Sequence, residues 1–292
     1  MSGNRPEAFT RSDLCVSRAC PQPFCCGTFP PGAVFVDDIE AVPYGATVLF
    51  SAHGVSPAVE QTARARELCV IGATCPLVTK VHREARRFAA EGYTIALIGH
   101  RGHDEVEGVI DEAPEKITVV ESESDLAAII TPKSAERPTR IAYLTQTTLS
   151  VDDTRHLVQL LRAQAPQLQG PPTADICYAT QNRQEALRAI LPEAQLALVI
   201  GSANSSNTQR LVEVAAAQGV PARRIDSPEE IAPEWLAGVE TAALTSGASV
   251  PEMLVWKTVD WLRARMPIEF ELRTLRVENR QFPLPASLRG IV

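Results

Sequence analysis

The sequence predicts an α/β protein built mainly from parallel sheets, and two observations carry this prediction. Apolar strand-like runs alternate with stretches of helical composition, an order that places strands in parallel sheets covered by helices. With 292 residues, the chain also exceeds the roughly 100 to 200 residues of one usual core. Two or three α/β units are therefore expected.

The strand-like runs recur along the chain, and each is followed by a helical pattern. The expected strands are 46–50, 68–71, 94–98, 140–144, 196–200 and 241–244. The run at 68–71 is interpreted as a short buried strand. A helix is expected from 57 to 67, and another begins near Cys75. Apolar residues at helical spacing follow this second start: Val78, Val81, Ala85 and Phe88.

Proline-rich breaks at 131–133 and 169–173 are candidate linkers between units. We expect one unit at 31–75, a second at 76–172 and a third at 173–268. The tail at 269–292 lacks a helical period and contains prolines that favour an extended chain, so it is expected to pack back across another unit.

Composition excludes several classes of function. No apolar run approaches the roughly 20 residues of a membrane span. A net charge of −7 argues against general affinity for nucleic acid, which needs a basic face. No export signal is visible at the start, and seven cysteines, an odd number, fit poorly with a disulfide framework. A cytoplasmic protein with free thiols is therefore expected.

Polar loops follow most of the strand-like runs and open helices. They are 51–56, 99–105, 145–150, 201–207 and 245–249. Such turns present free backbone N–H groups and the positive end of a helix dipole to an anion. Their hydroxyl, amide and imidazole side chains therefore predict a phosphate-binding site.

Cys75 and Cys177 are isolated cysteines far apart in the chain, and neither belongs to a CxxC pair. Each could be a buried structural cysteine, which is the more frequent role. Both stand at expected element starts, however, where the helix dipole favours the thiolate that metals bind. Iron–sulfur ligation is the natural use of scattered thiolates in a cytosolic chain.

His53 and His103 lie in loops beside glycines rather than on apolar faces, so a functional role is as plausible as a structural one. Glu105 and Glu107 follow His103. They could be helix-start acids that complement the dipole, or one of them could donate a proton in an anion-binding loop.

Ser205, Ser206 and Asn207 form a run of polar residues after Gly201. They could serve only as a helix N-cap, the default role of such residues. Three in succession exceed what capping requires, so ligand binding is the alternative that we keep.

The loops together resemble one family. The stretches SAHGVS at 51, ATCPLVTKVH at 73, GHRGHDEVEG at 99, TQTTLSVDDT at 145, DICYATQNRQEA at 175, GSANSSN at 201 and SGASVPE at 246 are similar to those of the 4-hydroxy-3-methylbut-2-enyl diphosphate reductases of the non-mevalonate isoprenoid pathway. The resemblance runs from about residue 32 to residue 289.

This resemblance implies three α/β units arranged as a trefoil around a central [4Fe-4S] cluster held by three cysteines. Cys75 and Cys177 align with two of these cysteines, Glu105 with the proton donor, and Thr147 with the residue that places the substrate hydroxyl. The implied diphosphate ligands are His53, His103, Ser205, Ser206, Asn207 and Ser249. The implied partners are a small allylic diphosphate substrate and an electron donor of the ferredoxin or flavodoxin type.

The first 30 residues depart from the family. They lack its Gly-Phe-Cys-Ala-Gly segment, which supplies the first cluster cysteine, and its Tyr-Val-Arg-His-Glu-Ile-Val-His-Asn segment. With suitable codons, residues 11–27 read one base later contain Tyr-Val-Cys-His-Glu-His-Val-His-Asn. We therefore infer that residues 1 to about 30 are translated out of frame and that the true start lies upstream. A divergent natural extension is the alternative, and an out-of-frame segment should be poorly ordered.

Two other functions stay open on the sequence. One is an inactive diphosphate-binding remnant, because two cysteines hold a cubane cluster less securely than three. The other is a zinc hydrolase with Cys75, Cys177, His53 and His103 as metal ligands, although no general-base pattern supports it.

Overall fold

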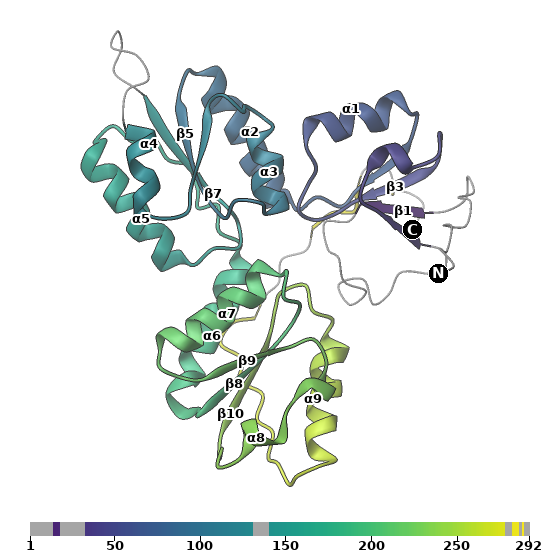
Figure 1. Cartoon of the computed structure of the whole chain (residues 1–292), viewed down its shortest axis with the longest axis vertical. Helices are drawn as coiled ribbons and strands as arrows, with labels where there is room; N and C mark the ends of the chain where they lie inside the picture. The colour runs from purple at the N-terminus through teal and green to yellow at the C-terminus, as the bar shows by residue number, and fades with distance from the viewer. Residues whose placement is uncertain (1–13, 18–32, 131–139, 278–281, 286–287, 289–292) are drawn as a thin grey trace, which may run out of the picture.

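The computed structural model describes residues 14–17, 33–130, 140–277, 282–285 and 288. It consists of three α/β units that meet at a common centre, so the expected trefoil is confirmed (Figure 1). Each unit has its own sheet, and every described strand pair is parallel. The parallel α/β class expected from the alternating pattern is therefore confirmed as well. Within the described residues, none of the helices has the length and apolar character required to cross a membrane.

The first unit has the strand order β2-β1-β3-β4. Its strands are β1 (Leu14–Ser17), β2 (Ala33–Val36), β3 (Thr47–Phe50) and β4 (Cys69–Gly72), with the short helix η1 (Ile39–Ala41) and helix α1 (Pro57–Ala65). α1 ends two residues earlier than expected, and Glu67 then takes a positive φ of 54°. β4 is not the buried strand that we expected. It lies at the sheet edge, where it has one neighbouring strand and Cys69 is exposed.

Four residues of the segment expected to be out of frame belong to a strand. Leu14–Ser17 form β1, which pairs in parallel with both β2 and β3. That residues 1 to about 30 are translated out of frame stays a prediction. The rest of residues 1–30 lies outside the described residues.

The second unit has the strand order β6-β5-β7. Its strands are β5 (Thr94–Ile98), β6 (Ile117–Val120) and β7 (Ile141–Thr145). Its helices are α2 (Pro76–Ala90), α3 (Asp104–Ile110), η2 (Glu123–Asp125), α4 (Leu126–Ile130) and α5 (Val151–Gln164). Both faces of this sheet are buried, since Ile95 and Leu97 pack with α2 and α3 while Ala96 and Ile98 pack with α4 and α5. The apolar residues expected on α2 are all buried.

The third unit has the strand order β10-β8-β9. Its strands are β8 (Leu196–Ile200), β9 (Ala222–Ile225) and β10 (Ala242–Ser246). Its helices are α6 (Tyr178–Ile190), η3 (Leu191–Glu193), α7 (Ser206–Ala217), η4 (Pro228–Glu230), α8 (Pro233–Leu236) and α9 (Glu252–Arg263). The central strand β8 is buried along its whole length. We propose 75/76 and 172/173 as the boundaries between the three units.

The tail after α9 forms neither helix nor strand up to residue 277. Arg273 pairs with Glu193, and Arg276 pairs with Glu185, so this part of the tail lies against the third unit. Figure 1 then traces the yellow tail back toward the first unit.

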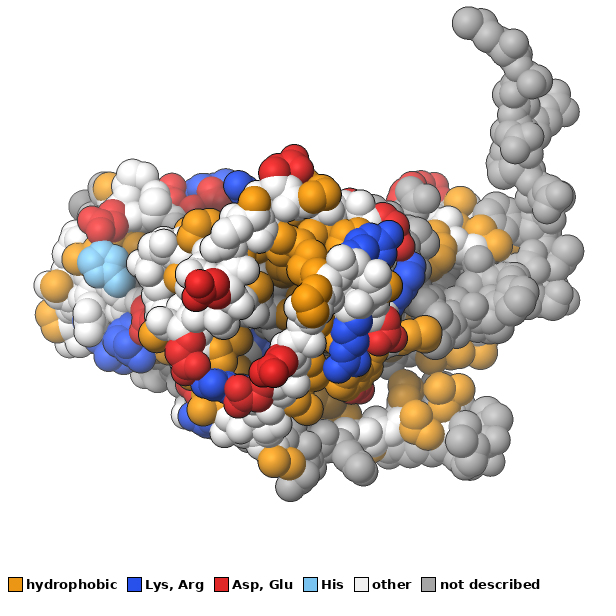
Figure 2. All heavy atoms as spheres, turned by 90° about the horizontal axis from the view of Figure 1, so that it is seen from below, with side chains coloured by type: hydrophobic (Ala, Val, Ile, Leu, Met, Phe, Trp, Pro, Cys, Tyr) orange, Lys and Arg blue, Asp and Glu red, His pale blue; other side chains and the backbone are white. Residues whose placement is uncertain are grey.

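The face of the molecule seen from below carries charges of both signs among apolar side chains, rather than a broad basic surface (Figure 2). Exposed Met253 on α9 and Leu272 in the tail are among the larger apolar side chains at the surface of this unit.

Candidate functional site

Cys75 and Cys177 are the N-cap residues of α2 and α6, as the sequence predicted. Their backbones are tied to two of the polar loops. The N–H of Cys75 donates to the carbonyl of Ala52 at 3.0 Å, and the N–H of Cys177 donates to the carbonyl of Thr147 at 2.7 Å. Both thiols are half-buried at helix N-termini, where a thiolate is favoured by the dipole.

The pKa of the Cys75 thiol responds to two other predicted site residues. Burial raises this pKa above its usual value, and the N–H groups of Leu77 and Val78 oppose the rise by hydrogen bonding. The electrostatic effects of Cys177 and Glu105 raise the pKa of Cys75 further. Two acidic groups on other segments of the chain therefore act electrostatically on Cys75.

Glu105 is the second residue of α3 and is almost completely buried, with 1% of its surface exposed. Its carboxyl oxygens accept two hydrogen bonds from Thr147, one from the backbone N–H at 2.7 Å and one from Oγ1 at 2.9 Å. Burial raises the pKa of Glu105 to about 7, although the bonds from Thr147 oppose the rise. The side chain can therefore hold or release a proton at neutral pH, as a general acid must.

Glu107 differs from Glu105 although both lie in the first turn of α3. Its carboxylate is exposed and accepts a hydrogen bond from the backbone N–H of Gly102 at 2.9 Å. This is the helix-start role that the sequence left open for both acids. Of the two, only Glu105 has the buried setting that suits proton transfer.

His103 is the N-cap of α3, and its Nδ1 accepts a hydrogen bond from the N–H of Glu105 at 3.2 Å. Burial lowers the pKa of His103 to about 4, with further lowering from His53 and His100. The ring is therefore neutral at pH 7 and carries its proton on Nε2. The ring of His53 packs edge-on against that of His103, with centroids 5.6 Å apart. The two histidines from different loops are thus brought together.

Ser205, Ser206 and Asn207 have different surroundings at the start of α7. Ser205 is the N-cap, and its Oγ accepts a hydrogen bond from the N–H of Thr208 at 3.3 Å. The Oγ of Ser206 accepts from Thr148 Oγ1 at 2.9 Å and from Gln146 Nε2 at 3.2 Å, so Ser206 joins the second and third units. Asn207 is buried, and its Oδ1 has no hydrogen-bond partner among the described residues. Ser249, in contrast, is exposed in the loop after β10.

Several buried polar atoms near these loops lack a hydrogen-bond partner among the described residues. They are Ser51 Oγ, His53 Nδ1, Thr145 Oγ1, Ser202 Oγ, Asn207 Oδ1 and Thr208 Oγ1. All belong to, or adjoin, the ends of β3, β7 and β8. A buried polar atom without a partner is costly, so this clustering points to a polar ligand held at the shared ends of the strands.

Sequence reasoning missed Gln146, Asp175 and Lys80, although all three lie within motifs that it quoted. Gln146 is buried and links three loops, since its Oε1 accepts from the N–H of His100 at 3.0 Å while its Nε2 donates to Ser206. Asp175 is buried and pairs with Lys80 on α2 at 2.7 Å. Each is a charged or amide residue inside one of the family-like motifs, and that was the available signal for these roles.

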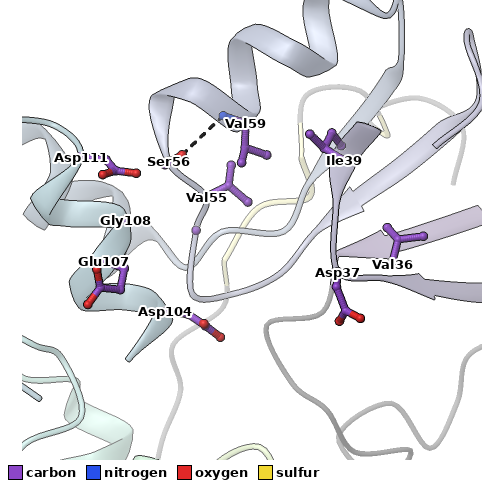
Figure 3. A pocket seen from close by; sticks show the side chains of 11 residues that line it. Val36, Asp37, Ile39, Val55, Ser56, Val59, Asp104, Glu107, Gly108 and Asp111 are labelled. Carbon is purple, nitrogen blue, oxygen red and sulfur yellow. Dashed lines mark hydrogen bonds between the residues drawn. The ribbon is translucent and has the colours of Figure 1, made fainter. Parts of the chain in front are cut away.

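A separate pocket of about 270 Å³ lies between the first unit and α3 (Figure 3). α3 contributes Asp104, Glu107 and Gly108, and its C-cap residue Asp111 continues the same helical face. Glu105 does not line this pocket and is bonded to Thr147 instead. The pocket is therefore distinct from the site that contains the cysteines.

Cys75 and Cys177 supply part of the donor set that an iron–sulfur cluster needs. Thiolate sulfur is the ligand that such clusters prefer, and two thiols at helix N-termini meet this need in part. Within the described part of the chain, no group of three or more metal-ligating side chains occurs. Among the described residues, Cys75 and Cys177 can therefore serve as two protein ligands of a cluster, and no third ligand is present beside them.

Comparison with known proteins identifies close relatives. A family model for the LytB protein matches residues 30–263. The 4-hydroxy-3-methylbut-2-enyl diphosphate reductase of Rhodopirellula baltica is 50% identical over 259 residues, which cover 89% of this chain and 80% of that protein. The reductase of Leifsonia xyli is 52% identical over 260 residues, covering 88% and 76% of the two chains.

Solved structures agree with the sequence relatives. The E-1-hydroxy-2-methyl-but-2-enyl-4-diphosphate reductase of Plasmodium falciparum superposes with a TM-score of 0.88 at 35% identity, covering 97% of this chain and 89% of that one. The solved structure of an (E)-4-hydroxy-3-methyl-but-2-enyl diphosphate reductase, the terminal enzyme of the non-mevalonate pathway, superposes with a TM-score of 0.59 at 27% identity, covering 87% of this chain and 88% of that one.

Proposed function

The chain belongs to the LytB protein family, and from this premise we propose that it is a reductase of 4-hydroxy-3-methylbut-2-enyl diphosphate. The reaction takes up two electrons and two protons, breaks the allylic C–O bond, releases water and forms isopentenyl and dimethylallyl diphosphates. The relatives and the loop geometry favour this function over an inactive remnant, and over a zinc hydrolase.

We assign Cys75 and Cys177 as ligands of a [4Fe-4S] cluster. When bound, the cluster supplies the electrons, which a donor of the ferredoxin or flavodoxin type would deliver. The support for this assignment is the position of both thiols at helix N-termini and the electrostatic effect of Cys177 on the pKa of Cys75. A cytoplasmic location is part of the same proposal.

Glu105 is proposed as the proton donor to the leaving hydroxyl. Its pKa of about 7 leaves a proton available under neutral conditions. Thr147 anchors the carboxyl group through two hydrogen bonds, so the acid keeps one orientation while the substrate hydroxyl binds beside it. The buried pairing of Glu105 with Thr147 is the observation that carries the proposed chemistry.

The diphosphate is proposed to bind His53, His103, Ser205, Ser206, Asn207 and Ser249. The support is the cluster of buried unpartnered polar atoms beside the N-termini of α3 and α7. The Nε2–H of neutral His103 and the hydroxyl protons can donate to phosphate oxygens, as can the backbone N–H groups at these helix starts. An anion can thus be held locally in a protein of net charge −7.

The test uses anaerobically reconstituted protein with reduced methyl viologen as the electron source. It compares the chain itself with a form in which residues 1–30 are replaced by the alternative reading frame and the missing cysteine segment. The restored form should convert the diphosphate to both products. Glu105→Gln should lower its turnover by about 10²- to 10⁴-fold while the substrate still binds, because the amide has no proton to give.

Glu107→Gln is the matched control, since this carboxylate lies on the same helix turn but is exposed. It should leave turnover close to that of the parent. Failure of the restored form to yield either product would refute the proposed reaction, and normal turnover of Glu105→Gln would refute the role given to Glu105.

A further inference from the structure

Lys80 connects the two segments that carry the site cysteines. It lies on α2, which begins directly after Cys75, and its Nζ donates to Asp175 Oδ1 at 2.7 Å. The same Nζ donates to the carbonyl oxygens of Thr173 at 2.6 Å and Ala174 at 3.4 Å. One ammonium group thereby binds three consecutive residues of the irregular segment that leads to Cys177.

Asp175 is held from a second side. Its Oδ2 accepts a hydrogen bond from the N–H of Thr145 at 3.2 Å, at the end of β7. Two residues later, the N–H of Cys177 donates to the carbonyl of Thr147. The short segment before α6 is therefore fixed both to α2 and to the end of β7, and Cys177 has little freedom to move relative to Cys75.

The burial of this ion pair argues for a geometric role. The side chain of Asp175 is 0% exposed and that of Lys80 is 23% exposed. Buried ion pairs often add no stability over well-packed apolar side chains of the same size, because desolvation offsets the attraction. Directional bonds from one cation to three acceptors do, however, fix a chain segment in one place.

We propose that Lys80 and Asp175 are positioning residues that set the separation of the Cys75 and Cys177 thiols. The ion pair holds the two cysteine-bearing helix starts together before any cluster is present. This inference rests on the proposed function in one respect: a fixed separation matters because both thiols are proposed to bind one cluster.

The test measures thiol proximity in the cluster-free, reduced protein. Dibromobimane becomes fluorescent when it bridges two thiols, and peptide mapping identifies the Cys75–Cys177 product. Reaction of each cysteine with iodoacetamide corrects for changes in accessibility. After this correction, Lys80→Met should bridge its thiols about tenfold or more slowly than the parent. Release of the segment before Cys177 lowers the effective concentration of one thiol near the other.

Arg87→Met is the matched control. Arg87 is a cation on the same helix that pairs with Glu84 and Glu91 of α2 and not with the Cys177 segment. The bridging rate of this variant should stay within about twofold of the parent rate. The variant keeps the bonds from Lys80 to the segment before Cys177, so the effective concentration of one thiol near the other is unchanged. A folded Lys80→Met protein that bridges at the parent rate would overturn the proposal.

Lys80→Met leaves Asp175 buried without its partner and could prevent folding. The double variant Lys80→Met with Asp175→Leu removes both charges and keeps apolar volume at the site. Slow bridging in the folded double variant supports the proposal, and bridging at the parent rate overturns it. Iron uptake is measured separately. A frame-restored protein that bridges normally but takes up no iron would contradict the proposed function and leave this inference standing.

Discussion

Replacement of Glu105 by Gln should change how the stability of the cluster-free protein depends on pH. The pKa of Glu105 is raised from 4.5 to about 7 in the folded state because the carboxyl group is buried. Between these two values the folded state holds a proton that the unfolded state has lost. The contribution of Glu105 to stability is therefore fully present below about pH 4.5 and is lost as the pH rises to about 7.

The magnitude follows from the size of the shift. Each pH unit within this window changes the free energy of unfolding by about 1.4 kcal/mol, so the whole window corresponds to about 3 kcal/mol. Glu105→Gln removes this dependence. The unfolding free energy of the variant minus that of the parent should then rise by about 3 kcal/mol from about pH 4.5 to about pH 7. The lost bonds to Thr147 add an offset that does not vary with pH.

His103 makes the difference measurement necessary. Its pKa is lowered from 6.5 to about 4, so its contribution is present above about pH 6.5 and is lost as the pH falls toward 4. Glu105 and His103 change the free energy of unfolding in opposite directions over most of the range from about pH 4.5 to about pH 7. These two residues together should therefore give the parent protein little net change of stability with pH. Subtraction of parent from variant removes the His103 slope.

The assay is urea unfolding of both proteins, reduced and free of metal, at a series of pH values at 25 °C. Glu107→Gln serves as the control and should show a flat difference, because its carboxylate is exposed. A Glu105→Gln difference that is flat, or that falls as the pH rises, would refute the inference that burial keeps this carboxyl protonated.

Three further predictions concern the metal site, the third unit and the start of the chain. Cys75→Ser or Cys177→Ser should abolish iron binding in the frame-restored form, because a hydroxyl has no accessible anionic state at neutral pH. Full iron and sulfide content in either variant would contradict the ligand assignment. Gly201→Ala should lower the melting temperature more than Gly219→Ala does, since both glycines have positive φ but only a Cβ at Gly201 would meet Thr208 Oγ1, at 2.2 Å. Equal losses would show that the contact with Thr208 relaxes freely. The chain as given should hold less iron and sulfide, and show less reductase activity, than the restored form, and equal values measured side by side would contradict the out-of-frame inference.

The strands that the sequence located best are the central ones of the second and third units. β5 and β8 have the same bounds in the structure as in the prediction, because a strand with neighbours on both sides is apolar throughout and stands out from its surroundings. β9, at a sheet edge, was not predicted. Its sequence Ala-Arg-Arg-Ile contains two charged residues that an edge position tolerates, so no apolar run marks it.

The sequence by itself determined the α/β class, the helix starts at Cys75 and Cys177, and the polar loops that end the strands. These features depend on local order along the chain, and local order is what residue patterns record. Only the tertiary structure decided that Thr147 binds Glu105, that Lys80 reaches Asp175, and that His53 lies against His103. Each of these contacts joins segments that are distant in sequence. The raised pKa of Glu105 likewise arises from burial by the packed units, a property that no stretch of sequence contains.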